Sequence, residues 1–264
     1  MSTGENIRLC YPLPIAKLYE AVQLESEPRQ RVRKLIDLYE RTSQYLVLVG
    51  LASCAHYGVS DPKVETLRPG LERPSLGHWI ELLKALSRAL RPHDPAFLTA
   101  EPRHVYKDDV ISAAAQAVAR IANVRLPKRI MMHHFLDALV EFRNKKIGHG
   151  VLSSFEARQV STPLEKGLAQ WLGGLSTLHE RRLLHVARVE WQAGRFLCTG
   201  TNLNAGTSLT PARWSAMIPS IPTASTCTSL PETISFRYTP SLPTTATPIC
   251  CMSIVSFPPR ANRY

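Results

Sequence analysis

Residues 141–150 read Glu-Phe-Arg-Asn-Lys-Lys-Ile-Gly-His-Gly. Within them, Arg143, Asn144 and His149 supply an always-charged guanidinium, an amide and an imidazole that titrates near neutrality. These groups suit chemistry on a phosphodiester. In a straight helix the six-residue step from Arg143 to His149 turns the chain by about 600°, which puts the two side chains on different faces. The cluster therefore requires the helix to end near Ile147, and the two glycines of the stretch favour unwinding there.

The chain around this stretch is predicted to be helical from about Pro14 to Glu180, because apolar residues recur at three- and four-residue steps. We expect a loop from Asp61 to Pro74. The predicted helices are Arg31–Tyr57, ended by Gly58; Leu76–Leu90, after the N-cap Ser75; Lys107–Ile121; Lys128–Lys146, with Pro127 in its first turn; and Leu164–Leu178, started by Pro163. This pattern predicts a mainly α fold, an up-and-down helical bundle around a single core.

After His185 the apolar pattern changes from helical to alternating. Residues 184–191 and 195–199 flank Gln192-Ala193-Gly194, which predicts a small β-hairpin with glycine in its turn. A lone hairpin is marginally stable in water and should dock on another part of the protein. The predicted organisation is therefore a helical domain over residues 1–182, a hairpin appendage over 183–205 and a tail over 206–264.

The tail is rich in proline, serine and threonine and has no sustained apolar period. Such a segment buries too little surface to offset its chain entropy, so we expect it to be disordered. A sharper hypothesis is that the tail comes from a shifted reading frame, since translating the back-translated stretch Ser220–Leu230 in another frame favours the alternation that a strand needs. An ordinary low-complexity tail is the alternative. The nucleotide sequence of the gene distinguishes the two explanations.

Composition narrows the classes of partner. The formal net charge is +11 and the sequence pI is about 9.6, which favours an acidic partner such as nucleic acid, with a solvated basic surface as the plain alternative. The six cysteines lack CxxC spacing, so no metal or disulfide framework is expected, and a reducing cytoplasm is the simplest setting. No apolar run reaches the roughly 20 residues of a membrane span, so no membrane is expected.

Other chemical signals are weak. His133 and His134 are adjacent on a predicted helix and point to different faces, which argues against a metal site. The chain has no phosphate-cradling glycine loop, nucleophile elbow or kinase signature. An NTPase, hydrolase or kinase reaction is therefore not expected of these residues.

The Arg-Asn-x4-His-Gly pattern at the end of a bundle helix resembles the HEPN superfamily, and the helical context fits over about residues 31–178. The resemblance implies metal-independent endoribonuclease activity without a cofactor, in a homodimer whose motif helices face each other. It implies that Arg143 binds the phosphoryl oxygens, that His149 acts in acid–base catalysis and that Asn144 orients one of them. Lys145 and Lys146 would attract the RNA backbone.

The first 205 residues also resemble modules of bacterial multidomain conflict and signalling proteins, through Tyr11-Pro-Leu-Pro-Ile, Arg73-Pro-Ser-Leu-Gly-His-Trp and the motif itself. This resemblance implies a component of a defence or signalling system, with a partner protein or the role of a toxic effector. The competing interpretation is a non-catalytic protein-interaction or regulatory helical domain. In that case Arg143 would pair with Asp137 or Glu141, Asn144 would satisfy free carbonyls and His149 would cap the helix end.

Overall fold

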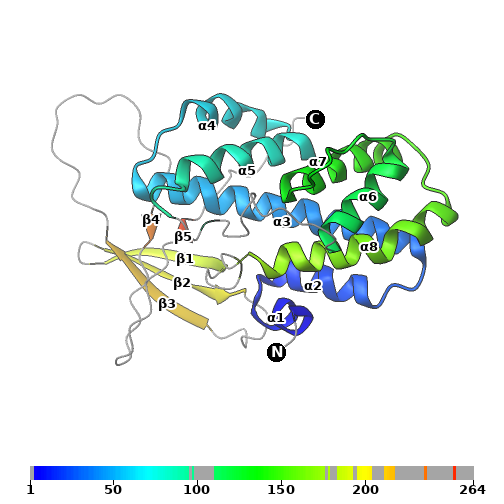
Figure 1. The fold of residues 1–264 in the computed structure, drawn as a ribbon. Coiled ribbons are helices and arrows are strands. Elements are labelled where there is room, and N and C mark those ends of the chain that lie inside the picture. Colours follow the sequence, from blue (N-terminus) through cyan, green and yellow to red (C-terminus); the bar gives the residue numbers. More distant parts are fainter. Residues whose placement is uncertain are drawn as a thin grey trace, which may run out of the picture.

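The computed structural model describes residues 3–94, 97, 110–175, 178, 183–192, 195–203, 211–217, 235–236 and 252–253. Within these residues the protein is mainly α-helical, as predicted (Figure 1). The helices are α1 (Thr3–Cys10), α2 (Leu13–Gln23), α3 (Pro28–Tyr57), α4 (Pro62–Leu67), the 3-10 turn η1 (Arg68–Glu72), α5 (Leu76–Leu90), α6 (Val110–Ala122), α7 (Met132–Phe142), the π-helical turn η2 (Arg143–Gly148) and α8 (Ser154–Gly173). The strands are β1 (Leu184–Gln192), β2 (Arg195–Asn202), β3 (Pro211–Met217), β4 (Ser235–Phe236) and β5 (Met252–Ser253).

The long helix α3 runs through the middle of the fold, with α5 on one side and α2 and α8 on the other (Figure 1). Its predicted apolar face is buried at Leu35, Leu38, Tyr39, Leu46 and Val49. The helix ends where the sequence predicted, because Gly58 adopts a left-handed conformation with φ of 64°.

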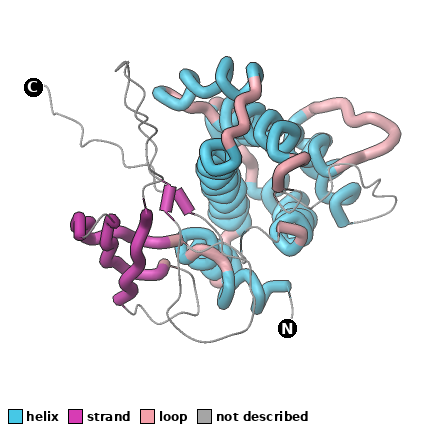
Figure 2. Tube along the Cα trace, turned by 90° about the vertical axis from the view of Figure 1, so that its left-hand side faces the viewer, coloured by secondary structure: helices cyan, strands magenta, loops and turns pink. Residues whose placement is uncertain are grey.

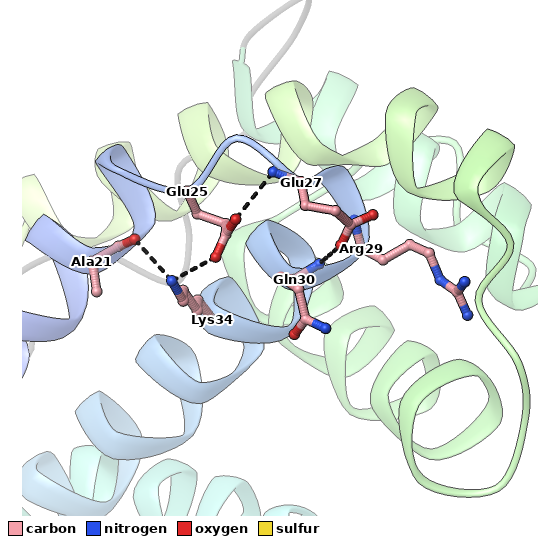
Figure 3. A network of polar contacts seen from close by, with 6 residues as sticks. All are labelled: Ala21, Glu25, Glu27, Arg29, Gln30 and Lys34. Atoms are coloured by element: carbon pink, nitrogen blue, oxygen red, sulfur yellow. Dashed lines mark hydrogen bonds and ion pairs between the residues drawn. The ribbon is translucent and has the colours of Figure 1, made fainter.

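The start of α3 is fixed by side chains that satisfy its free amides (Figure 3). The Glu27 carboxylate accepts hydrogen bonds from the backbone amides of Arg29 and Gln30, at 3.1 and 2.7 Å. Lys34, one turn further along, pairs with Glu25 at 2.6 Å. These contacts set the angle between α2 and α3.

Two predicted helix starts were wrong, each placed by a proline. Helix α8 begins at Ser154 and carries Pro163 in its interior, because Ser153 and Glu156 form a capping box that starts the helix earlier. Helix α7 begins at Met132 rather than beside Pro127. A proline inside a helix removes one hydrogen bond without ending the helix when the surrounding packing holds it.

The predicted loop from Asp61 to Pro74 was also wrong. The Asp61 carboxylate accepts from the amides of Lys63 and Val64, and this N-cap starts α4, which leads into η1. Helix α1 was not predicted. By contrast, the N-cap at Ser75 is confirmed, since its hydroxyl accepts from the His78 amide at 3.3 Å.

Helices α6, α7 and α8 meet at one crowded point. A Cβ placed on Gly167 of α8 would lie 2.6 Å from the Ala114 Cβ of α6 and 3.0 Å from the Phe135 ring of α7. The alanine-rich sequence of α6 allows this close helix packing. This contact fixes the first turn of α7 against α6 and α8.

Two tyrosines tie α8 and α7 to helices that precede them in the chain. The buried Tyr11 hydroxyl donates to the Leu172 carbonyl at 2.5 Å, and burial raises the pKa of Tyr11 to about 12. The Tyr39 hydroxyl donates to the Leu136 carbonyl of α7 at 3.0 Å, and its ring packs edge-on against Trp171. These bonds lock α3, α7 and α8 together around the core.

Strands β1, β2 and β3 form an antiparallel sheet in that order, which lies to one side of the helices (Figure 2). One main-chain hydrogen bond of 2.7 Å attaches it to α2: the Leu13 amide donates to the Leu203 carbonyl. The Leu203 amide donates to the Leu183 carbonyl, also at 2.7 Å, and extends the pairing of β1 with β2. The turn residues 193 and 194 lie outside the described residues. So does the predicted tail over 206–264, apart from β3, β4 and β5.

No helix in the described parts of the chain is long and apolar enough to cross a membrane.

Candidate functional site

The helix that carries the motif changes its winding at the motif itself. Helix α7 ends at Phe142, and residues 143–148 continue as the π-helical turn η2. The His149 amide donates to the Asn144 carbonyl, five residues back, at 3.1 Å. The helix end predicted near Ile147 is therefore one residue from the observed end at Gly148, but the helix widens into a π-turn before that point. Such π-turns are rare and occur frequently at functional sites.

The wide turn brings two of the three motif side chains into direct contact. The Arg143 guanidinium donates to the Asn144 side-chain oxygen at 3.3 Å, and both side chains are partly buried. The same guanidinium lies along the turn, since a Cβ on Gly148 would be 3.5 Å from its Nη1. His149 is exposed and follows directly, with its backbone bonded to Asn144. Asn144 is thus the residue that links the other two.

The glycine after the histidine is required by a close backbone contact. A Cβ on Gly150 would lie 2.0 Å from the Lys145 carbonyl oxygen and 3.1 Å from its carbon. No side chain fits at that distance unless the backbone moves. Gly150 therefore allows the chain to fold back over the π-turn and keeps His149 beside it.

The two lysines of the motif are both in ion pairs. Lys145 pairs with Glu141 at 3.4 Å, and about half of each side chain is exposed, so this contact is weak. Lys146 pairs with Glu156 at 2.6 Å, and each side chain is only 25% exposed. Because Glu156 belongs to the capping box of α8, the Lys146 pair holds η2 against the first turn of that helix.

The pairings that the non-catalytic interpretation expected for Arg143 are not those found. Asp137 pairs with Lys84 at 2.6 Å, and Glu141 pairs with Lys145. Arg143 instead contacts Asn144. Its charge is therefore not neutralised by the two carboxylates that precede it on α7.

A charged cluster on α3 adjoins the motif and was missed in the sequence. Asp37 is flanked at four-residue steps by Arg33 and Arg41, all three exposed. Desolvation by neighbouring side chains raises the pKa of Asp37, and the charges of these two arginines lower it by less. The charge of Arg143 also lowers it, which places Arg143 near this cluster. The Arg-x3-Asp-x3-Arg spacing on a predicted helix was the signal available beforehand.

A cavity of about 460 Å³ lies against the face of α7 before the motif. Its lining includes Ser75, His78, Lys84, Asp137 and Glu141, and it contains neither Arg143 nor His149. His134 does not line this cavity; its Nδ1 accepts from the Met131 amide at 3.0 Å and so caps the start of α7. None of the described side chains forms a group of three or more metal-ligating residues.

The Lys146–Glu156 pair makes a pH-dependent contribution to stability. Hydrogen bonds from Lys146 and then from Ser153 lower the pKa of Glu156 from 4.5 to about 2. A lowered folded-state pKa gives stability that is present above the unfolded-state pKa and is lost as the pH falls towards 2. We expect Glu156→Gln to lower the free energy of unfolding by about 1–2 kcal/mol at pH 7 and by clearly less at pH 3.

Urea unfolding at the two pH values measures this difference. Glu72→Gln, which removes an exposed carboxylate at the end of η1, serves as the control and should change little. An equal loss at both pH values for Glu156→Gln would show that the ionised carboxylate is not the source of the stability.

Comparison with known proteins gives no match: no family model, no curated protein and no solved structure matches this chain. The interpretation of the site therefore rests on the motif residues, their geometry and the helices that hold them.

Proposed function

We propose that this chain is a HEPN-like helical module of a bacterial defence or signalling system and that it cleaves RNA without a metal ion. The observation that carries the proposal is the π-turn η2, in which the Arg143 side chain contacts that of Asn144 and the backbone amide of the exposed His149 bonds to the Asn144 carbonyl. In its finer detail, the proposed fold is an up-and-down bundle with a β-hairpin appendage. The proposed setting is the cytoplasm.

The proposed reaction is attack of a ribose 2′-hydroxyl on the adjacent phosphorus. The 2′-oxygen forms a bond to phosphorus, the bond to the 5′-oxygen breaks, and the departing oxygen takes up a proton. The products are a 2′,3′-cyclic phosphate and a 5′-hydroxyl. Arg143 stabilises the charge on the phosphoryl oxygens through charge-assisted hydrogen bonds. His149 removes the proton of the 2′-hydroxyl or delivers one to the departing 5′-oxygen. Asn144 keeps Arg143 oriented towards the phosphoryl oxygens.

The reaction needs a base and an acid on opposite sides of the phosphorus, and one motif supplies one histidine. A homodimer in which two motif helices face each other supplies both. The exposed position of His149 supports this arrangement, because its ring is accessible to a second protomer and to RNA. In the proposed dimer the two copies of Arg143 and His149 form one composite site.

The test is cleavage of single-stranded RNA by the full chain in the presence of EDTA. We expect Arg143→Ala and His149→Ala each to reduce the rate at least tenfold, because each removes a group that acts in the transition state. Arg88→Ala, a substitution in the last turn of α5, is the control for loss of a positive charge. Equal rates for the wild type and both motif variants would show that the motif does not act in cleavage. Loss of activity in EDTA would show that cleavage requires a metal ion.

A non-catalytic interaction or regulatory module is the second candidate. The observation that favours it is that Lys145 and Lys146, the predicted RNA-binding residues, are both engaged in ion pairs within the chain. In this alternative the motif stabilises the end of α7 and the chain acts by binding a partner protein. Motif variants would then lose stability without any change in RNA cleavage, which the same assay combined with thermal unfolding would reveal.

A further inference from the structure

Phe155 is an exposed aromatic side chain next to the motif. It lies in the first turn of α8, six residues after His149, and is 65% exposed. Val151, between the two, is 76% exposed. A phenylalanine with this much exposed surface gains little from burial in its own chain, so its apolar ring is available to a ligand.

The position of Phe155 is fixed relative to the motif by its neighbours on both sides. Glu156, the next residue, pairs with Lys146 of η2 at 2.6 Å. Ser153 caps the helix, with its hydroxyl 3.2 Å from the Glu156 amide. Leu152 is only 5% exposed and anchors the connecting loop in the core. The ring is therefore presented on a rigid helix turn that is tied directly to the π-turn.

The cations near Phe155 favour a polyanion such as nucleic acid as its ligand. Arg158, three residues further along α8, is on the same helix face and is exposed. Arg143 precedes by three residues Lys146, which pairs with Glu156, the neighbour of Phe155. A polyanion with flat apolar bases complements both the cations and the ring.

We propose that Phe155 is a stacking platform for a base of single-stranded RNA whose phosphate is bound at Arg143. This inference rests on the proposed ribonuclease function and adds the substrate class to it. Single-stranded nucleic acid is bound where a cationic groove follows the backbone and aromatic side chains stack on bases. In a duplex the bases are already stacked on each other, so Phe155 selects unpaired RNA.

The experiment measures binding of the full chain to a fluorescein-labelled oligouridine with 2′-O-methyl groups, which prevent cleavage. We expect Phe155→Ala to weaken binding about fivefold or more, because stacking on an aromatic side chain contributes at least that much per base. Phe155→Trp should retain the affinity of the wild type. Leu24→Ala removes an exposed leucine, 79% exposed, after α2 and should have no effect.

A second oligonucleotide separates stacking from a general loss of contact. With an abasic strand of the same length, the wild type and Phe155→Ala should bind equally. Unequal binding there, or equal binding to oligouridine, overturns the inference. A lower molar mass of Phe155→Ala in light scattering also overturns it and assigns the ring to a contact between protomers.

The two proposals fail in different ways. If the wild type binds the oligouridine and Arg143→Ala does not, but Phe155→Ala binds normally, only the stacking platform is lost. If the wild type neither binds nor cleaves single-stranded RNA, the proposed function fails and the platform fails with it.

Discussion

Gly150→Ala is expected to lower RNA cleavage about 100-fold, although it alters no group that acts on the substrate. The added Cβ would lie 2.0 Å from the Lys145 carbonyl oxygen, so the backbone after η2 has to move. That movement displaces His149 from its bond to Asn144. A displacement of about 1 Å at a catalytic group is enough to cost about 100-fold in rate. The initial rate of cleavage in EDTA is the measurement.

Gly148→Ala is the matched control for Gly150→Ala. A Cβ at Gly148 would make only ordinary contacts, at 3.5 Å from Arg143. Both variants exchange a motif glycine for alanine, so they change the entropy of the unfolded chain alike. We expect Gly148→Ala to keep most of the activity. Similar activity in the two variants would show that the close approach at Gly150 does not position His149.

Gly167→Ala is expected to lower the free energy of unfolding by about 2–3 kcal/mol, although alanine is the better helix former. The new methyl group would lie 2.6 Å from the Ala114 Cβ and 3.0 Å from the Phe135 ring, so α6 and α7 must shift away from α8. Overpacking of a well-filled core costs about 1–3 kcal/mol, more than the gain of roughly 1 kcal/mol in helix propensity. Urea unfolding monitored by circular dichroism measures the change.

Gly77→Ala in α5 is the control, because the nearest atoms to an added Cβ there are at 3.7 and 3.9 Å. This variant should be neutral or slightly stabilised. Ala114→Gly should recover part of the loss in the Gly167→Ala background, because it removes the atom in closest contact. If the changes in unfolding free energy caused by Gly167→Ala and Ala114→Gly simply add, then the contact with Ala114 is not the cause of the loss.

The helical content was predictable because apolar periodicity and caps are local. The C-terminal end of α3 at Gly58 and the start of α5 after Ser75 follow from the chemistry of those residues. The starts of α7 and α8 were missed because Pro127 and Pro163 resemble helix starts when tertiary packing is unknown. In α8, the Ser153-x-x-Glu156 capping box was the stronger signal.

The residues of the candidate site were chosen from their types, and the winding that the structure shows there was not predictable from the sequence. The glycines indicated a disturbed helix end, but a π-turn depends on a main-chain bond from His149 to Asn144 that no local propensity specifies. The ion pair between Lys146 and Glu156 depends on where α8 begins, so the misplaced start of α8 concealed it. Asp37 and its arginines adjoin Arg143 only through tertiary packing.

The bonds from the N-terminal helices to α8 have a consequence for how the chain emerges from the ribosome. Tyr11 bonds to Leu172, and Gln23 and Arg31 bond to Glu165. These bonds between residues far apart in the sequence form only after α8 has been synthesised, and such long-range contacts slow folding. Until then the part of α3 that packs against α8 stays uncovered, and an exposed apolar face of this kind makes a nascent chain prone to aggregation.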